Sequence, residues 1–138
     1  MDEQKTIVKV GVGIVVSDDR TRVLTCLRRA GDYYGGYWEF PGGKCEPNES
    51  PADCIVRELQ EELGITVRPV EELPLLQHYY ADRDRHVELH PWLCELVAGA
   101  PRAIEVADFR WCIPAELLQL KFLPANGPLF SEISNRLQ

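Results

Sequence analysis

The chain has 138 residues, of which 45% are hydrophobic and 27% charged, values typical of a globular protein that forms one compact domain. Its formal net charge is −7, which excludes the basic field needed to bind long nucleic acid non-specifically. The sequence shows neither a signal-peptide pattern nor an apolar run long enough to span a membrane, so it predicts a cytoplasmic protein.

The N-terminal part of the chain predicts a pair of strands and a loop. Alternate positions of residues 6–16 carry valine or isoleucine, whereas Gly11 and Gly13 lie on the other face. This alternation predicts a strand, and its glycines allow another element to approach closely. A return strand is predicted over residues 23–27. Residues 28–37, with three glycines and three tyrosines, predict a loop.

A short strand over residues 38–40 and a strong helix over residues 51–63 follow. Ser50 suits the N-cap position, and Pro51 suits the first helical position because it needs no intrahelical donor there. Gly64 suits the position that ends a helix. These signals make residues 51–63 the most firmly predicted helix of the chain.

The C-terminal half predicts further strands and two helices. The predicted strands are residues 72–80, 86–97 and 105–112, and the helices are one that begins at residues 114–118 and one over residues 126–137. Strands first, with a helix inserted among them, indicate an α+β fold in which a mixed sheet is sandwiched between helices.

The five cysteines are odd in number and never occur as C-x-x-C. This pattern favours reduced thiols used for packing over a disulfide framework or a zinc site. The cysteines are Cys26, Cys45, Cys54, Cys94 and Cys112.

Three carboxylates are crowded on the helix predicted over residues 51–63. At 100° per residue, Glu58, Glu61 and Glu62 fall within an arc of roughly 100° beside the apolar face. Like charges at this spacing repel one another, and divalent cations with oxygen ligands would remove that penalty. The alternative is a solvated acidic face in which Arg57 pairs with Glu61.

The wider spacing around these carboxylates favours the metal site. The pattern resembles the Nudix box, G-x5-E-x7-R-E-U-x-E-E-x-G-U, where U is a bulky aliphatic residue. Its seven fixed letters would match by chance about once in 10⁸ starting positions. The matching residues are Gly43, Glu49, Arg57, Glu58, Leu59, Glu61, Glu62, Gly64 and Ile65.

The resemblance implies the Nudix fold and the hydrolysis of a nucleoside diphosphate linked to another group. It implies one Nudix domain over residues 1–138, with the box at residues 43–65. It further implies that Arg57 and Glu49 orient the box through hydrogen bonds, and that Gly43 and Gly64 let its backbone turn tightly. The implied ligands of Mg²⁺, or of Mn²⁺ in its place, are the Gly42 carbonyl, Glu58, Glu61 and Glu62.

The match extends beyond the box to the MutT-like members of the family. Trp-Glu-Phe-Pro-Gly-Gly-Lys at residues 38–44 and Leu-Pro-Ala-Asn at residues 123–126 both resemble MutT stretches. Glu105 falls where a distant carboxylate completes the metal site or acts as the base, which leaves Glu105 and Glu58 as candidates for the general base. The implied substrate-binding residues are Arg29, Phe40, Lys44, Arg85 and Asn126.

Three of these residues have a second interpretation. Lys44 is a phosphate contact or a solvated lysine, and Phe40 is a wall of the base pocket or a core residue. Asn126 offers a donor and an acceptor to a base edge, but it also suits the N-cap of the last helix.

The resemblance implies a monomeric enzyme that cleaves a nucleoside triphosphate into the monophosphate and pyrophosphate. Removal of oxidised dGTP from nucleotide pools is the first interpretation of its role. The alternatives are hydrolysis of CTP or a modified pyrimidine triphosphate, and a non-catalytic module that recognises a base. Outside the box, His86, Glu88 and His90 alternate on one strand face, where they form a zinc triad, line a pocket or are solvated.

Overall fold

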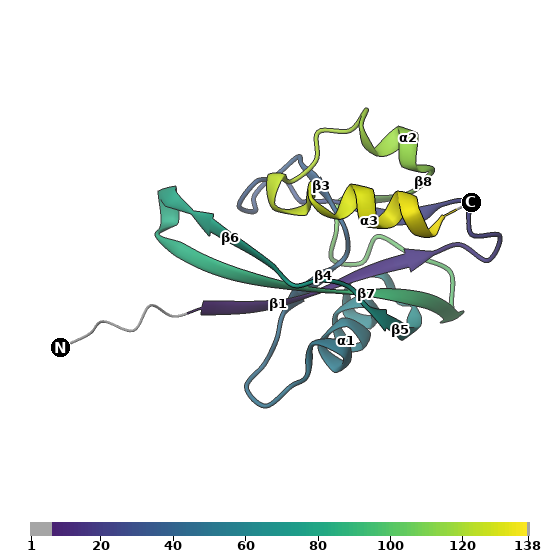
Figure 1. Ribbon diagram of the computed structural model, residues 1–138, viewed down its shortest axis with the longest axis horizontal. Helices are drawn as coiled ribbons and strands as arrows, with labels where there is room; N and C mark the ends of the chain where they lie inside the picture. The colour runs from purple at the N-terminus through teal and green to yellow at the C-terminus, as the bar shows by residue number, and fades with distance from the viewer. Residues whose placement is uncertain (1–6, 138) are drawn as a thin grey trace.

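The fold is seen in a computed structural model that describes residues 7–137 (Figure 1). A mixed sheet of eight strands lies between helix α1 (Pro51–Leu63) on one face and helices α2 (Pro114–Leu117) and α3 (Leu129–Arg136) on the other. The predicted α+β class and the sandwich of helices around a mixed sheet are therefore confirmed. Thr6, the first residue of the predicted strand 6–16, lies outside the described residues.

The sheet is built around two long parallel strands, β1 and β7. They pair from Ile7 opposite His86 to Val16 opposite Glu95, and the other pairings between named strands of the described chain are antiparallel. The main strand order is β3-β2-β1-β7-β5, with β4 on β1, β6 on β7 and β8 on β2. The strands are β1 (Ile7–Val16), β2 (Val23–Leu27), β3 (Trp38–Glu39), β4 (Gly42–Lys44), β5 (Thr66–Glu72), β6 (Leu76–Tyr80), β7 (Arg85–Ala98) and β8 (Asp108–Cys112), and the 3₁₀ turns are η1 (Ala81–Arg83) and η2 (Pro124–Asn126).

The alternation predicted for β1 separates two hydrophobic cores. Ile14 and its neighbours two positions away pack beneath α2 and α3, and Val15 packs with the apolar face of α1. A Cβ added at Gly13 would lie 3.1 Å from the side chains of Ile55 and Leu59. The glycine face of β1 therefore brings α1 directly onto the sheet, as predicted.

Helix α1 begins and ends where the sequence predicts. The Ser50 hydroxyl accepts a hydrogen bond from the Asp53 amide at 3.1 Å, and Pro51 is the first helical residue. Gly64 has a φ of 69° and donates its amide to the Gln60 carbonyl at 3.0 Å. Because both ends are fixed and the apolar face is buried, the carboxylates at its border have a defined position.

Several predicted boundaries were wrong. The strand predicted over residues 72–80 is two strands, since Glu72 ends β5 and Leu76 begins β6. Pro69 hid β5 from sequence analysis because proline weakens a strand pattern, and β5 accommodates it at the edge of the sheet beside a register shift. Strand β8 begins at Asp108 instead of Glu105, and helix α3 begins at Leu129 instead of Asn126.

The cysteines are free thiols within residues 7–137. Four of them are buried and Cys45 is partly exposed, in agreement with the predicted packing role. In the same part of the chain, no helix is both long and apolar enough to cross a membrane.

Candidate active site

The side chains of Glu58 and Glu62, one helical turn apart on α1, contact strand β4. The Glu58 carboxylate rests so closely against the Cα of Gly43 that an added Cβ would overlap it. Gly42 has a φ of 154°, and a Cβ there would overlap the Gly11 carbonyl oxygen. Only glycine backbone fits between β1 and the carboxylates, which explains the paired glycines Gly42 and Gly43 where the box begins.

Glu62 carries the largest electrostatic penalty at this site. Burial, which is the largest cause, and the negative charges of Glu58 and Glu39 together raise the pKa of Glu62 to about 9. A hydrogen bond from the Gly42 amide opposes this shift. The like charges and the shared burial show that these carboxylates crowd one another. A cation beside Glu58 and Glu62 would relieve this penalty, so the residues present suit a divalent metal.

Arg57 connects both ends of the box. Its Nε and Nη2 donate to the Glu49 carboxylate at 2.8 and 2.9 Å, and Nη1 donates to Glu58 at 3.0 Å and to Glu61 at 3.1 Å. Nη2 also donates to the Lys44 carbonyl at 3.1 Å. The arginine thus links the loop, the start of the box and the carboxylates, as the orienting role predicted for Arg57 and Glu49 requires.

The other predicted ligands lie nearby without joining the pair. The side chain of Glu61 is 49% exposed and is paired with Arg57. Glu105 is exposed ahead of β8, and its amide donates to the Glu62 carbonyl at 3.1 Å. Among residues 7–137, no three acidic, histidine or cysteine side chains converge closely enough to hold a metal ion.

The Glu49–Arg57 pair makes the box sensitive to acid. Hydrogen bonds from Arg57 lower the pKa of Glu49 to about 2, below the value of about 4.3 for an unperturbed glutamate. The unfolded chain therefore binds the proton first, and the pair's contribution to stability, complete above about pH 4.3, is lost as pH falls toward 2. We expect the free energy of unfolding to decline more steeply over this window in the wild type than in Glu49→Gln, as measured by urea titration at each pH. Parallel pH profiles would contradict the assignment.

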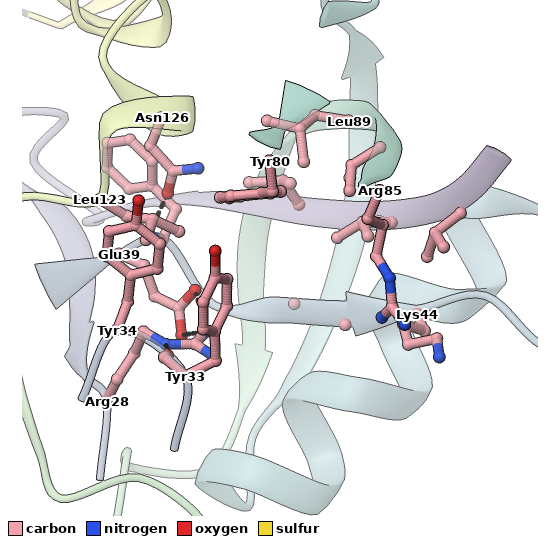
Figure 2. A pocket seen from close by; sticks show the side chains of 18 of the residues that line it. Arg28, Tyr33, Tyr34, Glu39, Lys44, Tyr80, Arg85, Leu89, Leu123 and Asn126 are labelled. Carbon is pink, nitrogen blue, oxygen red and sulfur yellow. Dashed lines mark hydrogen bonds and ion pairs between the residues drawn. The ribbon is translucent and has the colours of Figure 1, made fainter. Parts of the chain in front are cut away.

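A cavity of about 280 Å³ lies on the α3 side of the sheet, and its lining includes Gly42 and Gly43, the glycines that the two carboxylates contact (Figure 2). Lys44 and Arg85 stand at one end and Asn126 at the other, with tyrosine rings between them. The polar and aromatic residues of its lining are Arg28, Tyr33, Tyr34, Glu39, Phe40, Lys44, Tyr80, Arg83, Arg85 and Asn126. The cavity therefore offers positive charge at one end and hydrogen-bonding groups at the other.

Asn126 is held rigidly at its end of the cavity. It is 3% exposed, and its Oδ1 accepts a hydrogen bond from the Phe40 amide at 3.0 Å. The amide nitrogen points into the cavity in Figure 2. Pro128, not Asn126, stands at the N-cap position of α3, so the capping interpretation was wrong. Asn126 presents a donor to whatever fills the cavity.

Phe40 serves the core as well as the cavity. It is 2% exposed, and its ring packs on Phe122 at 4.9 Å and on Phe130 at 6.1 Å between centroids. The core interpretation of Phe40 is therefore confirmed, although one surface of the residue lines the cavity.

Arg28, rather than Arg29, lies in the cavity lining. Its Nη1 donates to both oxygens of Glu39 at 3.0 Å. Burial raises the pKa of Glu39, and Arg28 opposes this shift. Arg29 turns away and donates to the Ile104 carbonyl at 2.7 Å. Sequence analysis missed Arg28 and its partner Glu39. Which of the two adjacent arginines faces the cavity depends on how the loop that follows them turns.

The alternating residues of β7 do not form a triad. His90 Nε2 lies 3.2 Å from Glu88 Oε1, and the His86 ring packs on Tyr79 at 4.5 Å. His86 and Glu88 line a second cavity of about 220 Å³. No zinc cluster occurs at these residues or elsewhere in the described chain, so the pocket-lining interpretation is the one that the geometry supports.

Comparison with known proteins agrees with this geometry. The family model of the NUDIX domain matches residues 8–133. The chain is 37% identical over 123 residues to the CTP pyrophosphohydrolase of Escherichia coli (strain K12), which covers 89% of this chain and 88% of that protein. It is 36% identical over 126 residues to the 8-oxo-dGTP diphosphatase of the same organism, covering 91% and 95%.

Among solved structures, the solution structure of the E. coli ORF135 protein superposes with a TM-score of 0.77 at 35% identity. The alignment covers 92% of this chain and 88% of that one. Three findings lead to one assignment. They are the box, whose arginine and carboxylates lie on α1 and whose glycines flank that helix, the cavity lined by Gly42 and Gly43, and the relatives that match nearly the whole chain. The chain belongs to the Nudix hydrolase family, as a pyrophosphohydrolase related to MutT.

Proposed function

We propose that the chain is a Mg²⁺-dependent nucleoside triphosphate pyrophosphohydrolase that acts on oxidised dGTP and releases the nucleoside monophosphate and pyrophosphate. The observation that carries this proposal is the partly buried Glu58–Glu62 pair, because Gly42 and Gly43, which the pair contacts, line a cavity whose far end presents the Asn126 amide. Metal-binding carboxylates beside a site for a base fit a nucleotide with its phosphates toward α1.

The metal would be held by Glu58 and Glu62, with Glu61, Glu105 and the Gly42 carbonyl as further ligands. Mn²⁺ is a substitute with the same preference for oxygen ligands. When bound, the cation would neutralise the phosphates and lower the pKa of the attacking water. Because Glu61 is half exposed and paired with Arg57 at the surface, its side chain can turn to the metal at little cost.

The remaining groups bind and orient the substrate. The exposed cations Lys44 and Arg85 at the α1 end of the cavity would contact phosphate oxygens. The Asn126 amide would donate to an acceptor on the base edge, such as O6 of a guanine. Glu105 or Glu58 would accept the proton from water. The role of Arg29 in substrate binding, the monomeric state, the single domain and the cytoplasmic location stay predictions.

Hydrolysis of CTP or a modified pyrimidine triphosphate is the second candidate function. It is favoured by the relative named CTP pyrophosphohydrolase. That relative is 37% identical to this chain, and the 8-oxo-dGTP diphosphatase is 36% identical. A non-catalytic module is disfavoured because the box retains every carboxylate.

A substrate panel tests the proposal. Oxidised and normal dGTP, CTP, 5-methyl-dCTP, ADP-ribose and dinucleoside polyphosphates are compared by kcat/KM with Mg²⁺. We expect oxidised dGTP to lead. A lead by CTP or 5-methyl-dCTP would transfer the proposal to the pyrimidine candidate, and turnover confined to ADP-ribose or dinucleoside polyphosphates would overturn both.

Asn126→Asp tests the base contact without breaking the core. The new carboxylate still accepts from the Phe40 amide, but it replaces the donor that faces the cavity with an acceptor. We expect kcat/KM for guanine nucleotides to fall by roughly 10- to 100-fold, because an unpaired buried acceptor costs about 1–3 kcal/mol. Cytosine nucleotides, whose amino group donates, should gain relative to them. An unchanged substrate ranking would count against base contact by Asn126.

A further inference from the structure

Two segments that are far apart in the sequence meet beside the cavity. They are the loop of residues 28–37 and the turn η1 between β6 and β7. The Tyr33 hydroxyl donates to Asp82 Oδ1 at 2.6 Å, and the Arg83 guanidinium lies 3.9 Å from the centroid of the Tyr33 ring. The Tyr33 and Tyr80 rings meet edge to face at 5.5 Å. We name these four residues the tyrosine clasp.

The clasp forms an aromatic wall of the cavity. Tyr33, Tyr80 and Arg83 line it together with Tyr34, whose ring lies 4.7 Å from Tyr33 and 5.9 Å from Tyr80. In Figure 2 the rings of Tyr33 and Tyr80 stand between Asn126 and the cationic end. This is the stretch that a base would occupy if its edge met Asn126 and its phosphates met Lys44.

Backbone strain marks both segments. Tyr34, next to Tyr33, has a φ of 59°, and Asp84, next to Arg83, has a φ of 45°. Residues other than glycine rarely adopt this left-handed region, and such strain concentrates where surrounding contacts enforce a functional geometry. Ordering two partly exposed loops also costs conformational entropy. Tyr80 also packs against the core on this face of the sheet, but its ring and those of Tyr33 and Tyr34 line the cavity.

We propose that Tyr80 is a substrate-binding residue that stacks on the nucleobase, and that the Tyr33–Asp82 contact positions it. This inference rests on the proposed function in taking a nucleotide as the occupant of the cavity. An aromatic face suits a base of either kind, and stacking of this type contributes about 1–3 kcal/mol per base. Tyr80 therefore supplies affinity for the base, while Asn126 distinguishes one base from another.

The test compares ligands with and without a base. Dissociation constants are measured by calorimetry for the α,β-methylene analogues of dGTP and dCTP and for inorganic tripolyphosphate, which has no base. We expect Tyr80→Leu, which keeps the bulk, to weaken the better-bound analogue about tenfold and to leave tripolyphosphate binding unchanged, while Tyr80→Phe binds like wild type. Equal effects on the analogue and on tripolyphosphate, or no effect on either, would overturn the proposal.

The positioning contact is tested by a double-mutant cycle. Tyr33→Phe and Asp82→Ala should each weaken the analogue by a smaller and similar factor, and the double variant no further than either alone. Tyr79→Phe is the matched control, since it removes a tyrosine–aspartate bond of the same length, 2.6 Å to Asp84, that lies outside this cavity. Independent, additive losses, or a loss in the control as large as in Tyr33→Phe, would overturn the positioning role.

Failure of the proposed function is distinguishable from failure of this inference. A wild type that binds the analogues through Tyr80 but hydrolyses no nucleoside triphosphate would refute the function and support the stacking role. A wild type that hydrolyses nucleotides but is indifferent to Tyr80→Leu would refute the stacking role alone. A wild type that binds the analogues no better than tripolyphosphate would also refute the stacking role of Tyr80.

Discussion

Glu62→Gln is expected to abolish Mg²⁺-dependent turnover and, at the same time, to stabilise the metal-free protein. The amide cannot supply the negative charge that a cation needs, so kcat should fall by at least roughly 10²- to 10³-fold, the loss typical for one electrostatic group at a reacting centre. The amide also removes a partly buried carboxyl whose pKa is raised to about 9.

The stability effect depends on pH in a defined direction. Between about pH 4.3, where an unfolded glutamate titrates, and pH 9, the folded metal-free protein holds a proton that the unfolded chain has released. The free energy of unfolding of the wild type therefore falls as pH rises through this window. Glu62→Gln lacks this cost, so its advantage should widen from pH 5 to pH 9 in chelator, as measured by urea titration.

Added Mg²⁺ should reverse the order of stability. It should raise the melting temperature of the wild type, because a ligand that binds only the folded state stabilises it, and should leave that of Glu62→Gln nearly unchanged. Glu72→Gln is the matched control, since Glu72 is exposed at the end of β5. A Gln variant that is less stable than wild type at pH 9 in chelator would contradict the crowding of Glu62, and retained turnover would contradict its role.

Gly43→Ala is expected to lower kcat/KM by on the order of 10- to 100-fold, the loss typical when groups that orient a metal ligand are disturbed. The added methyl would occupy the position of the Glu58 carboxylate, so the side chain must move away from Glu62. The fold should persist, because the backbone pairing of Gly43 with Gly11 does not depend on the side chain.

Two controls separate displacement of Glu58 from general damage. Gly31→Ala adds the same methyl where no atom lies within 4 Å, and should leave activity unchanged. Glu58→Asp withdraws the carboxylate by one methylene, so Gly43→Ala should cost little more when added to Glu58→Asp. Full activity in Gly43→Ala, or strictly additive losses in the double variant, would show that the contact between Gly43 and Glu58 is not required.

Local signals predicted the catalytic helix well. The cap at Ser50, the stop at Gly64 and the glycine face of β1 each act over a few residues or one strand, and the structure reproduces all three. The spacing of the box likewise encodes contacts within one loop and helix, such as that between Arg57 and Glu49. Short-range patterns therefore sufficed for the carboxylate side of the site.

The cavity required information that short-range patterns do not hold. Asn126 bonds to an amide 86 positions away, and Tyr33 meets Asp82 across 49 positions. Strand β4 consists of Gly-Gly-Lys and forms only because β1 offers it a partner. The residues that line the cavity are brought together by the sheet, so the substrate is harder to predict than the reaction.

The most direct test of the account is product analysis in ¹⁸O-labelled water. The purified chain is incubated with Mg²⁺ and its best nucleoside triphosphate, and the products are followed by ³¹P nuclear magnetic resonance. The account predicts equal amounts of nucleoside monophosphate and pyrophosphate, one ¹⁸O per turnover, and no turnover in chelator or in Glu58→Gln. Release of orthophosphate with nucleoside diphosphate, or turnover that persists in chelator, would contradict it.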